Sequence, residues 1–306
     1  MRLFTLQDGA ENVGLMSRSA PVSRIVYVNG AYVPEAEAKL SVFDRGLLFA
    51  DAVYEVTAVI DGKLLDFPGH MARLRRSLAE LRLPSPGSDQ EILAIHRELL
   101  ARNALTQGHI YLMVTRGEAD RDFVWPKHGT PPSFVLFTQK RDAVETREAV
   151  EGLRVITVPD LRWGRRDIKT VQLLYPSLAK MEAKSRGKDD AWMVEDGTIT
   201  EGTSNNAYIV TQDGTIVTRA LGHDILHGIT RAAIMKVAGE LALHVEERPF
   251  TVAEAQGARE AFITSAGAFV TPVVEIDETP IGDGRPGPIA RRLRAAYLEA
   301  ALAQAI

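Results

Sequence analysis

The decisive part of this sequence is the stretch Thr198-Ile199-Thr200-Glu201-Gly202-Thr203-Ser204-Asn205-Asn206, which follows Asp167-Ile168-Lys169-Thr170 along the chain. The upstream segment places Lys169 just after three arginines, at the expected junction of a strand and a helix. Neighbouring positive charge and burial both favour the neutral form of a lysine amine, which is the form that attacks an aldehyde. The downstream segment holds a lone carboxylate, Glu201, in a run of small hydrogen-bonding residues.

A reactive lysine and a lone acid are the two groups that a pyridoxal phosphate enzyme needs most. The lysine binds the cofactor covalently, and the acid keeps the pyridine nitrogen protonated so that the ring accepts electrons. Each segment also has a simpler interpretation, because Lys169 fits a solvated basic loop and Glu201 fits a turn between two strands. The two residues share a function only if the fold brings them together.

The composition is that of an ordinary globular protein. The chain has 306 residues, of which 45% are hydrophobic and 25% charged, and a net charge of -4. This length suffices for one large or two ordinary domains. Because the charge is slightly negative, we expect no nucleic acid and no membrane surface as a partner.

The residues that usually hold metals are missing or badly spaced. There are no cysteines, which excludes disulfides, thiolate nucleophiles, zinc ribbons and iron–sulfur clusters. The seven histidines show no metal-ligand spacing. We therefore expect no metal site.

The N-terminal residues 1–23 have no long apolar run and carry Asp8 and Glu11. These features argue against a signal peptide or a membrane span. We expect this segment to form an arm before the first strand and the protein to be cytoplasmic.

The first half of the chain predicts an α+β pattern. Asn29-Gly30 is typical of a type I′ hairpin turn, and Asp61-Gly62 turns back a long strand. Pro68 begins a helix whose apolar residues recur at three- and four-residue spacing. The expected strands are residues 52–60, 63–67, 109–115 and 133–138, and the expected helices are residues 68–81 and 89–105. Residues 1–139 are therefore predicted to form a small N-terminal domain.

The second half predicts a larger, strand-rich domain. A charged segment without a clear period, residues 140–150, is predicted to link it to the first domain. Residues 151–306 then hold a meander of short strands with helices packed outside. The expected strands include residues 153–158 and 261–264, and the expected helices are residues 171–185, 230–243, 252–256 and 287–303.

Three segments offer groups that bind phosphate. Gly228-Ile229-Thr230-Arg231 leads into a helix, so the amides of Ile229 and Thr230 point from its positive end. Thr264-Ser265-Ala266-Gly267 follows a predicted strand, and its small residues let an anion approach the backbone. Arg73 is placed to reach in with a bidentate fork. Each segment also fits a simpler role, as a helix cap, a loop and a solvated helix face.

One other motif points elsewhere. Gly282-Asp283-Gly284-Arg285-Pro286-Gly287 fits the pattern GxGxxG of a nicotinamide dehydrogenase. Its proline and its acid favour a hairpin-like loop, and no βαβ unit surrounds it. The chain contains no GxxxxGK[ST], HExxH or GxSxG motif.

From residue 25 to the C-terminus, the chain resembles the fold-type IV pyridoxal phosphate enzymes. This class contains D-amino-acid, branched-chain and (R)-amine transaminases and aminodeoxychorismate lyase. The resemblance rests on Phe43-Asp44-Arg45-Gly46, Val53-Tyr54-Glu55-Val56, His70-Met71-Ala72-Arg73-Leu74, Val114-Thr115-Arg116-Gly117, Asp167-Ile168-Lys169-Thr170, Thr200-Glu201-Gly202-Thr203-Ser204-Asn205, Leu226-His227-Gly228-Ile229-Thr230-Arg231, and Thr264-Ser265 before Thr271-Pro272-Val273. It implies a small α+β domain, a larger pseudo-barrel domain, and a homodimer whose active sites borrow residues from the partner.

The resemblance also implies roles for particular residues. Lys169 would bind pyridoxal 5′-phosphate covalently, and Glu201 would pair with the pyridine nitrogen. The residues implied to hold the phosphate are Arg73, Ile229, Thr230, Ser265 and Ala266. Leu226 would pack on the ring, and Tyr54 would line the site beside the lysine. Where Ala266 stands, family members with threonine add a hydroxyl to the phosphate, whereas here only the backbone amide serves.

Substrate contacts depart from the family pattern. Val53-Tyr54-Glu55-Val56 is similar to the D-amino-acid branch and unlike the branched-chain branch. The D-amino-acid branch places Arg-x-His in the loop after Val-Thr-Arg-Gly to bind the substrate carboxylate, but this chain has Arg121-Asp122-Phe123 there. A lysine that the same branch has shortly after the tyrosine is Ala58 in this chain. A ring in place of a hydrogen-bonding group weakens a carboxylate site and favours an apolar substituent. Tyr54, Arg121 and Phe123 are the expected substrate contacts, with Asp122 opposing a second carboxylate.

The implied reaction is ping-pong transamination. An amino group moves from a D-amino acid or an (R)-amine to a 2-keto acid, and freed Lys169 acts as the general base. The alternatives on the same fold are aminodeoxychorismate lyase and branched-chain amino acid transaminase. A binding protein without activity, and a dehydrogenase built on the glycine loop, are rivals from other classes.

Overall fold

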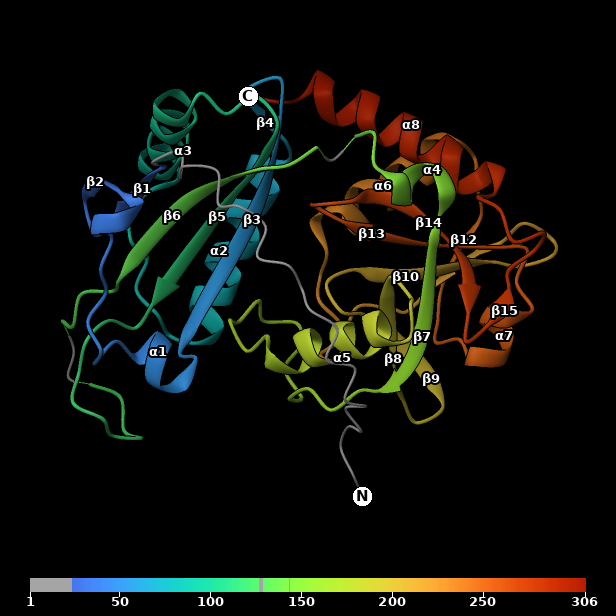
Figure 1. The fold of residues 1–306 in the computed structure, drawn as a ribbon, viewed down its shortest axis with the longest axis horizontal. Helices are drawn as coiled ribbons and strands as arrows, with labels where there is room; N and C mark the ends of the chain where they lie inside the picture. The colour runs from blue at the N-terminus through green and yellow to red at the C-terminus, as the bar shows by residue number, and fades with distance from the viewer. Residues whose placement is uncertain (1–23, 127–128, 143) are drawn as a thin grey trace, which may run out of the picture.

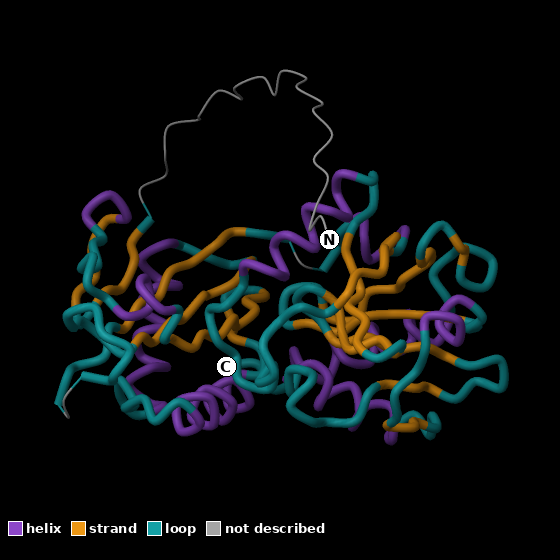
Figure 2. The backbone as a smooth tube through the Cα atoms, turned by 90° about the horizontal axis from the view of Figure 1, so that it is seen from below, coloured by secondary structure: helices purple, strands orange, loops and turns teal. Residues whose placement is uncertain are grey.

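The protein is built on two β-sheets that the chain completes one after the other (Figure 1). The computed structural model describes residues 24–126, 129–142 and 144–306. The predicted N-terminal arm, residues 1–23, lies outside the described residues. The strands form two separate groups, and helices lie on the outside of both (Figure 2).

The first sheet has six antiparallel strands in the order β2-β1-β6-β5-β3-β4. The Asn29-Gly30 turn has positive φ at both residues, 47° and 95°, as the type I′ geometry requires. The strands are β1 (Ile25–Val28), β2 (Ala31–Pro34), β3 (Ala52–Ile60), β4 (Lys63–Leu64), β5 (Gly108–Thr115) and β6 (Phe134–Lys140). Two short helical segments, η1 (Glu35–Glu37) and α1 (Arg45–Phe49), connect β2 to β3.

Strand β3, one place in from the edge of the first sheet, is buried on both faces because each face meets a different layer. Val53 and Val59 share a core with helices α2 (Phe67–Glu80) and α3 (Asp89–Asn103). Ala58 and Ile60 pack instead into a core made mainly by the second sheet and its helices. Alternate residues of one strand therefore bind the two halves of the molecule together.

The second sheet has nine strands, in the order β12-β11-β10-β13-β14-β7-β8-β9 with β15 on β14. Three pairings are parallel, β11 with β12, β14 with β7 and β7 with β8. The strands are β7 (Leu153–Pro159), β8 (Asp190–Glu195), β9 (Thr198–Gly202), β10 (Asn206–Val210), β11 (Ile216–Thr218), β12 (Val245–Glu247), β13 (Glu260–Ser265), β14 (Phe269–Ile276) and β15 (Thr279–Pro280).

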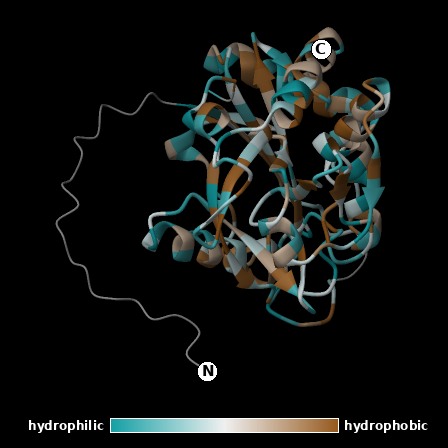
Figure 3. Ribbon diagram, turned by 90° about the vertical axis from the view of Figure 1, so that its right-hand side faces the viewer, coloured by the Kyte–Doolittle hydropathy of each residue, from teal (hydrophilic) through white to brown (hydrophobic). Residues whose placement is uncertain are grey.

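Helices accompany this curled sheet, and apolar stretches follow its strands (Figure 3). They are α4 (Arg147–Glu151), α5 (Leu174–Ser185), α6 (Ile229–Glu240), α7 (Val252–Gln256) and α8 (Pro288–Ala303). The predicted α+β class, with a β-rich second half and outer helices, is confirmed. None of the helices in the described ranges combines the length and the apolar character that crossing a membrane requires.

One expectation about local structure was wrong. Helix α5 begins at Leu174 and not at residue 171. The preceding residues are extended and pair with β3, through a bridge between Val53 and Thr170 and a hydrogen bond of 3.0 Å from the amide of Tyr54 to the carbonyl of Lys169. Helix α4 begins within residues 140–150, and the role of this segment as a linker stays a prediction. The division into two domains stays a prediction.

Candidate active site

A cavity of about 560 Å³ lies between the two sheets. It is lined by β3 and β5, by the extended segment around Lys169, by β9 and β10, and by the start of α6 and the end of β13. The predicted site residues that line it are Tyr54, Arg73, Lys169, Glu201, Leu226, Ile229, Thr230, Ser265 and Ala266. Arg121 and Phe123 do not line it.

Lys169 presents its amine to this cavity from the segment that pairs with β3. Its Nζ atom lies 4.2 Å from the centre of the Tyr54 ring. Its backbone amide donates a hydrogen bond of 3.3 Å to the hydroxyl of Ser77 on α2. Within the described part of the chain, the amine forms no ion pair, so no carboxylate holds it away from the cavity.

The arginines before Lys169 do not act as the sequence argument supposed. Arg162 pairs with Asp160 and Glu201, Arg165 pairs with Asp167 and Glu80, and Arg166 pairs with Glu195. Each guanidinium is therefore matched by carboxylates, and the segment places no unpaired positive charge beside Lys169. The pairs of Arg162 with Asp160 and of Arg165 with Asp167 instead hold the loop that carries Lys169.

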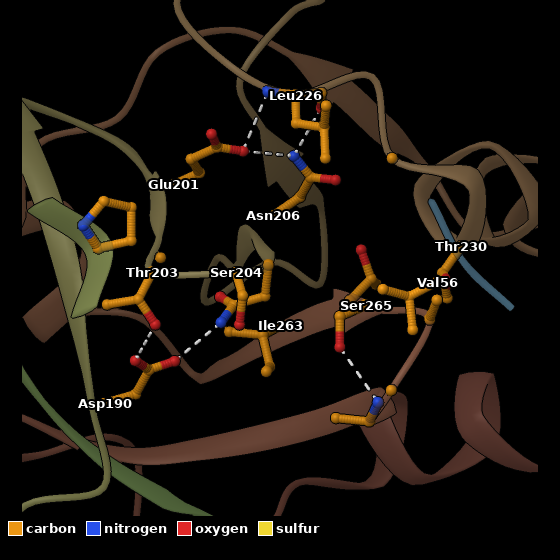
Figure 4. A pocket seen from close by; sticks show the side chains of 18 of the residues that line it. Val56, Asp190, Glu201, Thr203, Ser204, Asn206, Leu226, Thr230, Ile263 and Ser265 are labelled. Carbon is orange, nitrogen blue, oxygen red and sulfur yellow. Dashed lines mark hydrogen bonds between the residues drawn. The ribbon is translucent and has the colours of Figure 1, made fainter. Parts of the chain in front are cut away.

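Glu201 is only 3% exposed, and both oxygens of its carboxylate accept hydrogen bonds. Oε1 accepts a hydrogen bond of 2.6 Å from Nη1 of Arg162, and Oε2 accepts from Nδ2 of Asn206 at 3.0 Å and from the amide of Leu226 at 3.1 Å (Figure 4). Burial raises the pKa of Glu201 above its ordinary value, and Arg162 offsets part of that rise. The site thus holds an acid in a fixed orientation, and the positive charge of Arg162 stabilises its ionised form.

Arg162 is a site residue that the sequence reasoning missed. It bridges Glu201 and Asp160, and Asp160 also accepts a hydrogen bond of 2.7 Å from the hydroxyl of Thr200. Asp160 and Arg162 stand two residues apart, directly after the predicted strand 153–158. That spacing was the one sequence signal available, because the pairing with Glu201 depends on β7 and β9 lying in the same sheet.

Asp190 fixes the turn that follows Glu201 (Figure 4). Its carboxylate accepts hydrogen bonds from the hydroxyl of Thr203 at 2.5 Å and from Nδ2 of Asn205 at 2.8 Å. The small residues after Glu201 therefore turn the chain sharply and are held by one buried acid. The sequence predicts this turn, but it does not show that Asp190 holds it.

The start of α6 forms a corner suited to an anion. Gly228 is the N-cap of this helix and offers no side-chain cap, so the first amides keep their donors for another group. The hydroxyl of Thr230 is buried and has no hydrogen-bond partner among the described residues. The Ser265 hydroxyl accepts from the amide of Ala268 at 3.1 Å and closes the turn after β13. A phosphate would satisfy the unused donors here.

Arg73 also lines this part of the cavity, but three of its guanidinium N–H groups already donate to protein oxygens. Its Nε and Nη2 donate to the two oxygens of Glu55 at 2.8 and 2.7 Å, and Nη1 donates to the carbonyl of His227 at 3.1 Å. Burial alone raises the pKa of Glu55, but Arg73 and His70 outweigh it and lower the pKa to about 2. Glu55 thus occupies one edge of the guanidinium, and the role of Arg73 as a phosphate ligand stays a prediction. Of the five N–H groups, Glu55 and His227 take three, which leaves one on each Nη for an anion.

The predicted carboxylate contacts lie away from the cavity. The guanidinium of Arg121 stacks 5.5 Å from the Phe49 ring and 5.6 Å from the Phe123 ring. Phe123 is 79% exposed. Asp122 accepts hydrogen bonds through its carbonyl from Arg45 and through its side chain from the amide of Val124. In this chain these residues do not contact the cavity, and their predicted roles would need a second copy.

The family model for amino-transferase class IV matches residues 52–276, a range that spans Lys169, Glu201 and the α6 corner. This chain is a class IV aminotransferase. This chain is 38% identical over 272 residues to the D-alanine aminotransferase of Staphylococcus aureus (strain N315). The matched region covers 89% of this chain and 96% of that protein.

Solved structures agree on the fold of this aminotransferase. The T.th. branched-chain amino acid aminotransferase with pyridoxamine 5′-phosphate matches with a TM-score of 0.83 at 31% identity, covering 92% of this chain and 95% of that chain. The branched-chain amino acid aminotransferase of Escherichia coli also gives a TM-score of 0.83, at 26% identity and with 91% and 95% covered. The expected resemblance to fold-type IV enzymes is thus confirmed.

Proposed function

We propose that this aminotransferase uses pyridoxal 5′-phosphate to move an amino group from a D-amino acid or an (R)-amine to a 2-keto acid. The observation that carries this proposal is that Lys169 and Glu201 line the same cavity, with the uncapped start of α6 and Arg73 on its wall. The name of the Staphylococcus aureus relative supports the D-selective branch, because that protein is a D-alanine aminotransferase.

The residues present fit this cofactor. When bound, pyridoxal phosphate supplies an aldehyde for the amino group and a ring that takes up the electron pair of the broken Cα–H bond. The Lys169 amine, which forms no ion pair with a carboxylate of the described ranges, would hold the cofactor and then move the proton from the donor's Cα. Glu201, oriented by Arg162 and Asn206, would hold a proton on the ring nitrogen. Leu226 would pack against the ring.

The α6 corner would hold the phosphate. The amides of Ile229 and Thr230, the Thr230 hydroxyl, the turn at Ser265 and Ala266, and the free N–H groups of Arg73 are donors of the kind that phosphate requires. These donors and the pair formed by Lys169 and Glu201 line one continuous cavity, so one molecule would contact all of them.

We also propose that the protein works as a homodimer. Large apolar side chains are exposed on two surfaces, around Leu47 and Phe123 and along α5 at Leu174 and Met181. Exposed apolar patches of this kind mark protein interfaces. In a dimer, the loop of Arg121 and Phe123 would reach the cavity of the other copy, which it does not reach in its own chain.

Sedimentation velocity tests this proposal. We expect a dimer for the wild-type protein and monomers for Leu47→Asp and Leu174→Asp, because each change places a charge in an apolar interface. Leu302→Asp on α8 is a matched control that should remain dimeric. A wild-type monomer, or dimers of unchanged stability in both variants, would refute it.

A panel of paired enantiomers tests the proposed reaction. With a 2-keto acid as acceptor, we expect D-alanine or (R)-1-phenylethylamine to be preferred over the opposite enantiomer by about a hundredfold in kcat/KM. The similarity to branched-chain enzymes favours one other candidate, transamination of L-leucine. Preferred turnover of L-leucine would assign that function instead, and pyruvate release from aminodeoxychorismate without amino exchange would assign the lyase.

A further inference from the structure

The three segments that would hold the phosphate have one common neighbour, helix α8. Arg73 lies on α2, Thr230 stands in the first turn of α6, and Ser265 ends β13 at the turn into β14. Because these segments are far apart in the sequence, their donors converge only where other contacts fix them. Helix α8 packs against α6, β13 and β14 (Figure 1), and its Tyr297 is 2% exposed in the core that both sheets share.

The hydroxyl of Tyr297 links α8 to the start of α2. It donates a hydrogen bond of 2.7 Å to Oδ2 of Asp66, the N-cap residue of α2. An aspartate at an N-cap usually accepts from the first amides of its own helix, but among the described residues Asp66 accepts no such bond. Its backbone is left-handed, with φ at 53°. The carboxylate of Asp66 is thus directed to α8, and this contact fixes the end of the helix that carries Arg73 about two turns later.

The ring of Tyr297 packs on the turn that follows β13. Its centroid lies 5.8 Å from that of Phe269, which pairs with Ser265 across the turn. Phe269 has a φ of 59°, a conformation that an aromatic residue adopts only where its surroundings hold it. Arg294, about one turn before Tyr297 on α8, donates from Nη1 to the carbonyl of Ala268 at 2.8 Å. Helix α8 thus holds this turn through two side chains.

Thr230 lies beside the same Tyr297 hydroxyl. Burial and the charge of Asp66 raise the pKa of Tyr297 well above its ordinary value, and the neighbouring Thr230 hydroxyl lowers it by less. The phenol is therefore protonated at neutral pH and remains a donor to Asp66. Tyr297 accordingly has a neighbour in α6 and in the turn after β13, and another at the start of α2.

We propose that Tyr297 is a positioning residue whose hydrogen bond to Asp66 aligns α2 with α6 and with the turn after β13, and thereby sets the affinity for the cofactor's phosphate. The inference rests on the proposed function, because it takes the α6 corner as the phosphate site. Tyr297 is absent from the described residues that line the cavity, whereas Lys169 and Glu201 line it. Losing the hydroxyl leaves the Asp66 carboxylate without its donor, so cofactor affinity should fall while the chemistry of bound cofactor continues.

Cofactor titration tests this role. The full-length protein, freed of cofactor by dialysis, is titrated with pyridoxal phosphate, and binding is followed by absorption. We expect Tyr297→Phe, which keeps the ring against Phe269, to raise the dissociation constant about tenfold and to leave kcat at saturating cofactor within about twofold. An unchanged dissociation constant in this variant would overturn the proposal.

Variants of Asp66 show whether the hydrogen bond itself is responsible. Asp66→Asn keeps an acceptor for the hydroxyl and should stay within about threefold of the wild-type dissociation constant, whereas Asp66→Ala should match Tyr297→Phe. Combining Asp66→Ala with Tyr297→Phe should weaken binding no further than either change alone, because both remove one bond. Additive losses would contradict a shared role.

Thr157→Val is the matched control, since it removes a hydroxyl-to-carboxylate hydrogen bond elsewhere in the molecule. The Thr157 hydroxyl donates to Oδ2 of Asp277 at 2.5 Å and joins β7 to the turn after β14. Neither partner belongs to the described lining of the cavity. We expect this variant to lower the melting temperature about as much as Tyr297→Phe does, but to keep wild-type cofactor affinity. Equal losses of affinity would mean that Tyr297 acts only through stability.

Pyridoxal, which has the aldehyde but no phosphate, separates this role from the proposed function. Tyr297→Phe should leave the dissociation constant of pyridoxal unchanged, because the residue acts on the phosphate corner. A protein whose affinity for pyridoxal phosphate depends on Tyr297 but which transfers no amino group would refute the function and keep the positioning role. An active transaminase in which Tyr297→Phe weakens both compounds equally would refute the positioning role and keep the function.

Discussion

Lys169→Ala is expected to lower the transamination rate with D-alanine by at least about 10⁴-fold. The amine of Lys169 is the lysine nitrogen that lies over the Tyr54 ring, unpaired by any carboxylate in the described ranges, in the cavity that also contains Glu201. Alanine removes both the group that holds the cofactor and the base that moves the Cα proton. Steady-state kinetics at saturating pyridoxal phosphate measures the loss.

A matched control keeps this experiment specific. Lys236 lies on the exposed side of α6, 3.8 Å from Glu240, so Lys236→Ala should keep wild-type activity. The melting temperature of Lys169→Ala should stay close to that of the wild type, because the segment is held by backbone hydrogen bonds to Tyr54 and Ser77. Wild-type turnover by Lys169→Ala would end the assignment.

Glu201→Gln is expected to lower kcat by about 10²- to 10³-fold, a loss typical of removing one preorganised electrostatic group. The amide keeps the volume of the side chain, but it cannot stabilise a proton on the ring nitrogen. It also leaves Arg162 with Asp160 as its remaining carboxylate partner. Kinetics with D-alanine at saturating cofactor measures the effect, so a change in cofactor affinity does not disguise it.

Glu195→Gln is the control for this substitution. Glu195 is a partly exposed acid on β8 that pairs with Arg166 and does not line the cavity. It tests whether weakening any ion pair of this network slows the reaction. We expect its kcat to stay within about twofold of the wild type, because a partly exposed ion pair contributes little. Equal losses in the two variants would mean that Glu201 acts through stability and not on the cofactor.

The sequence could predict the elements of the site because their signals are local. Gly228, two residues before Thr230, marks the start of α6, and small residues after Glu201 mark a turn, whatever the rest of the fold does. Residues 52–60 predict β3 with its observed bounds, since the whole run is apolar enough for a strand buried on both faces. These patterns, read with the resemblance, placed nine predicted residues on one cavity.

The partners of those residues could not be predicted, because they come from segments far apart in the sequence. Arg162 reaches Glu201 across the second sheet, and Glu55 turns one edge of Arg73 away from the cavity. The segment of Lys169 stays extended because it pairs with β3, a tertiary contact that overrides the helical pattern from residue 171.

The most direct test asks which lysine holds the cofactor. The wild-type protein is incubated with pyridoxal phosphate, treated with borohydride to fix the cofactor on the lysine that binds it, and digested for peptide mass spectrometry. We predict that the label is found on Lys169, in the peptide that follows Arg166, and that it is absent when Lys169 is replaced by alanine. Stoichiometric label on any other lysine, or an unlabelled protein, would contradict the assignment of this cavity as the active site.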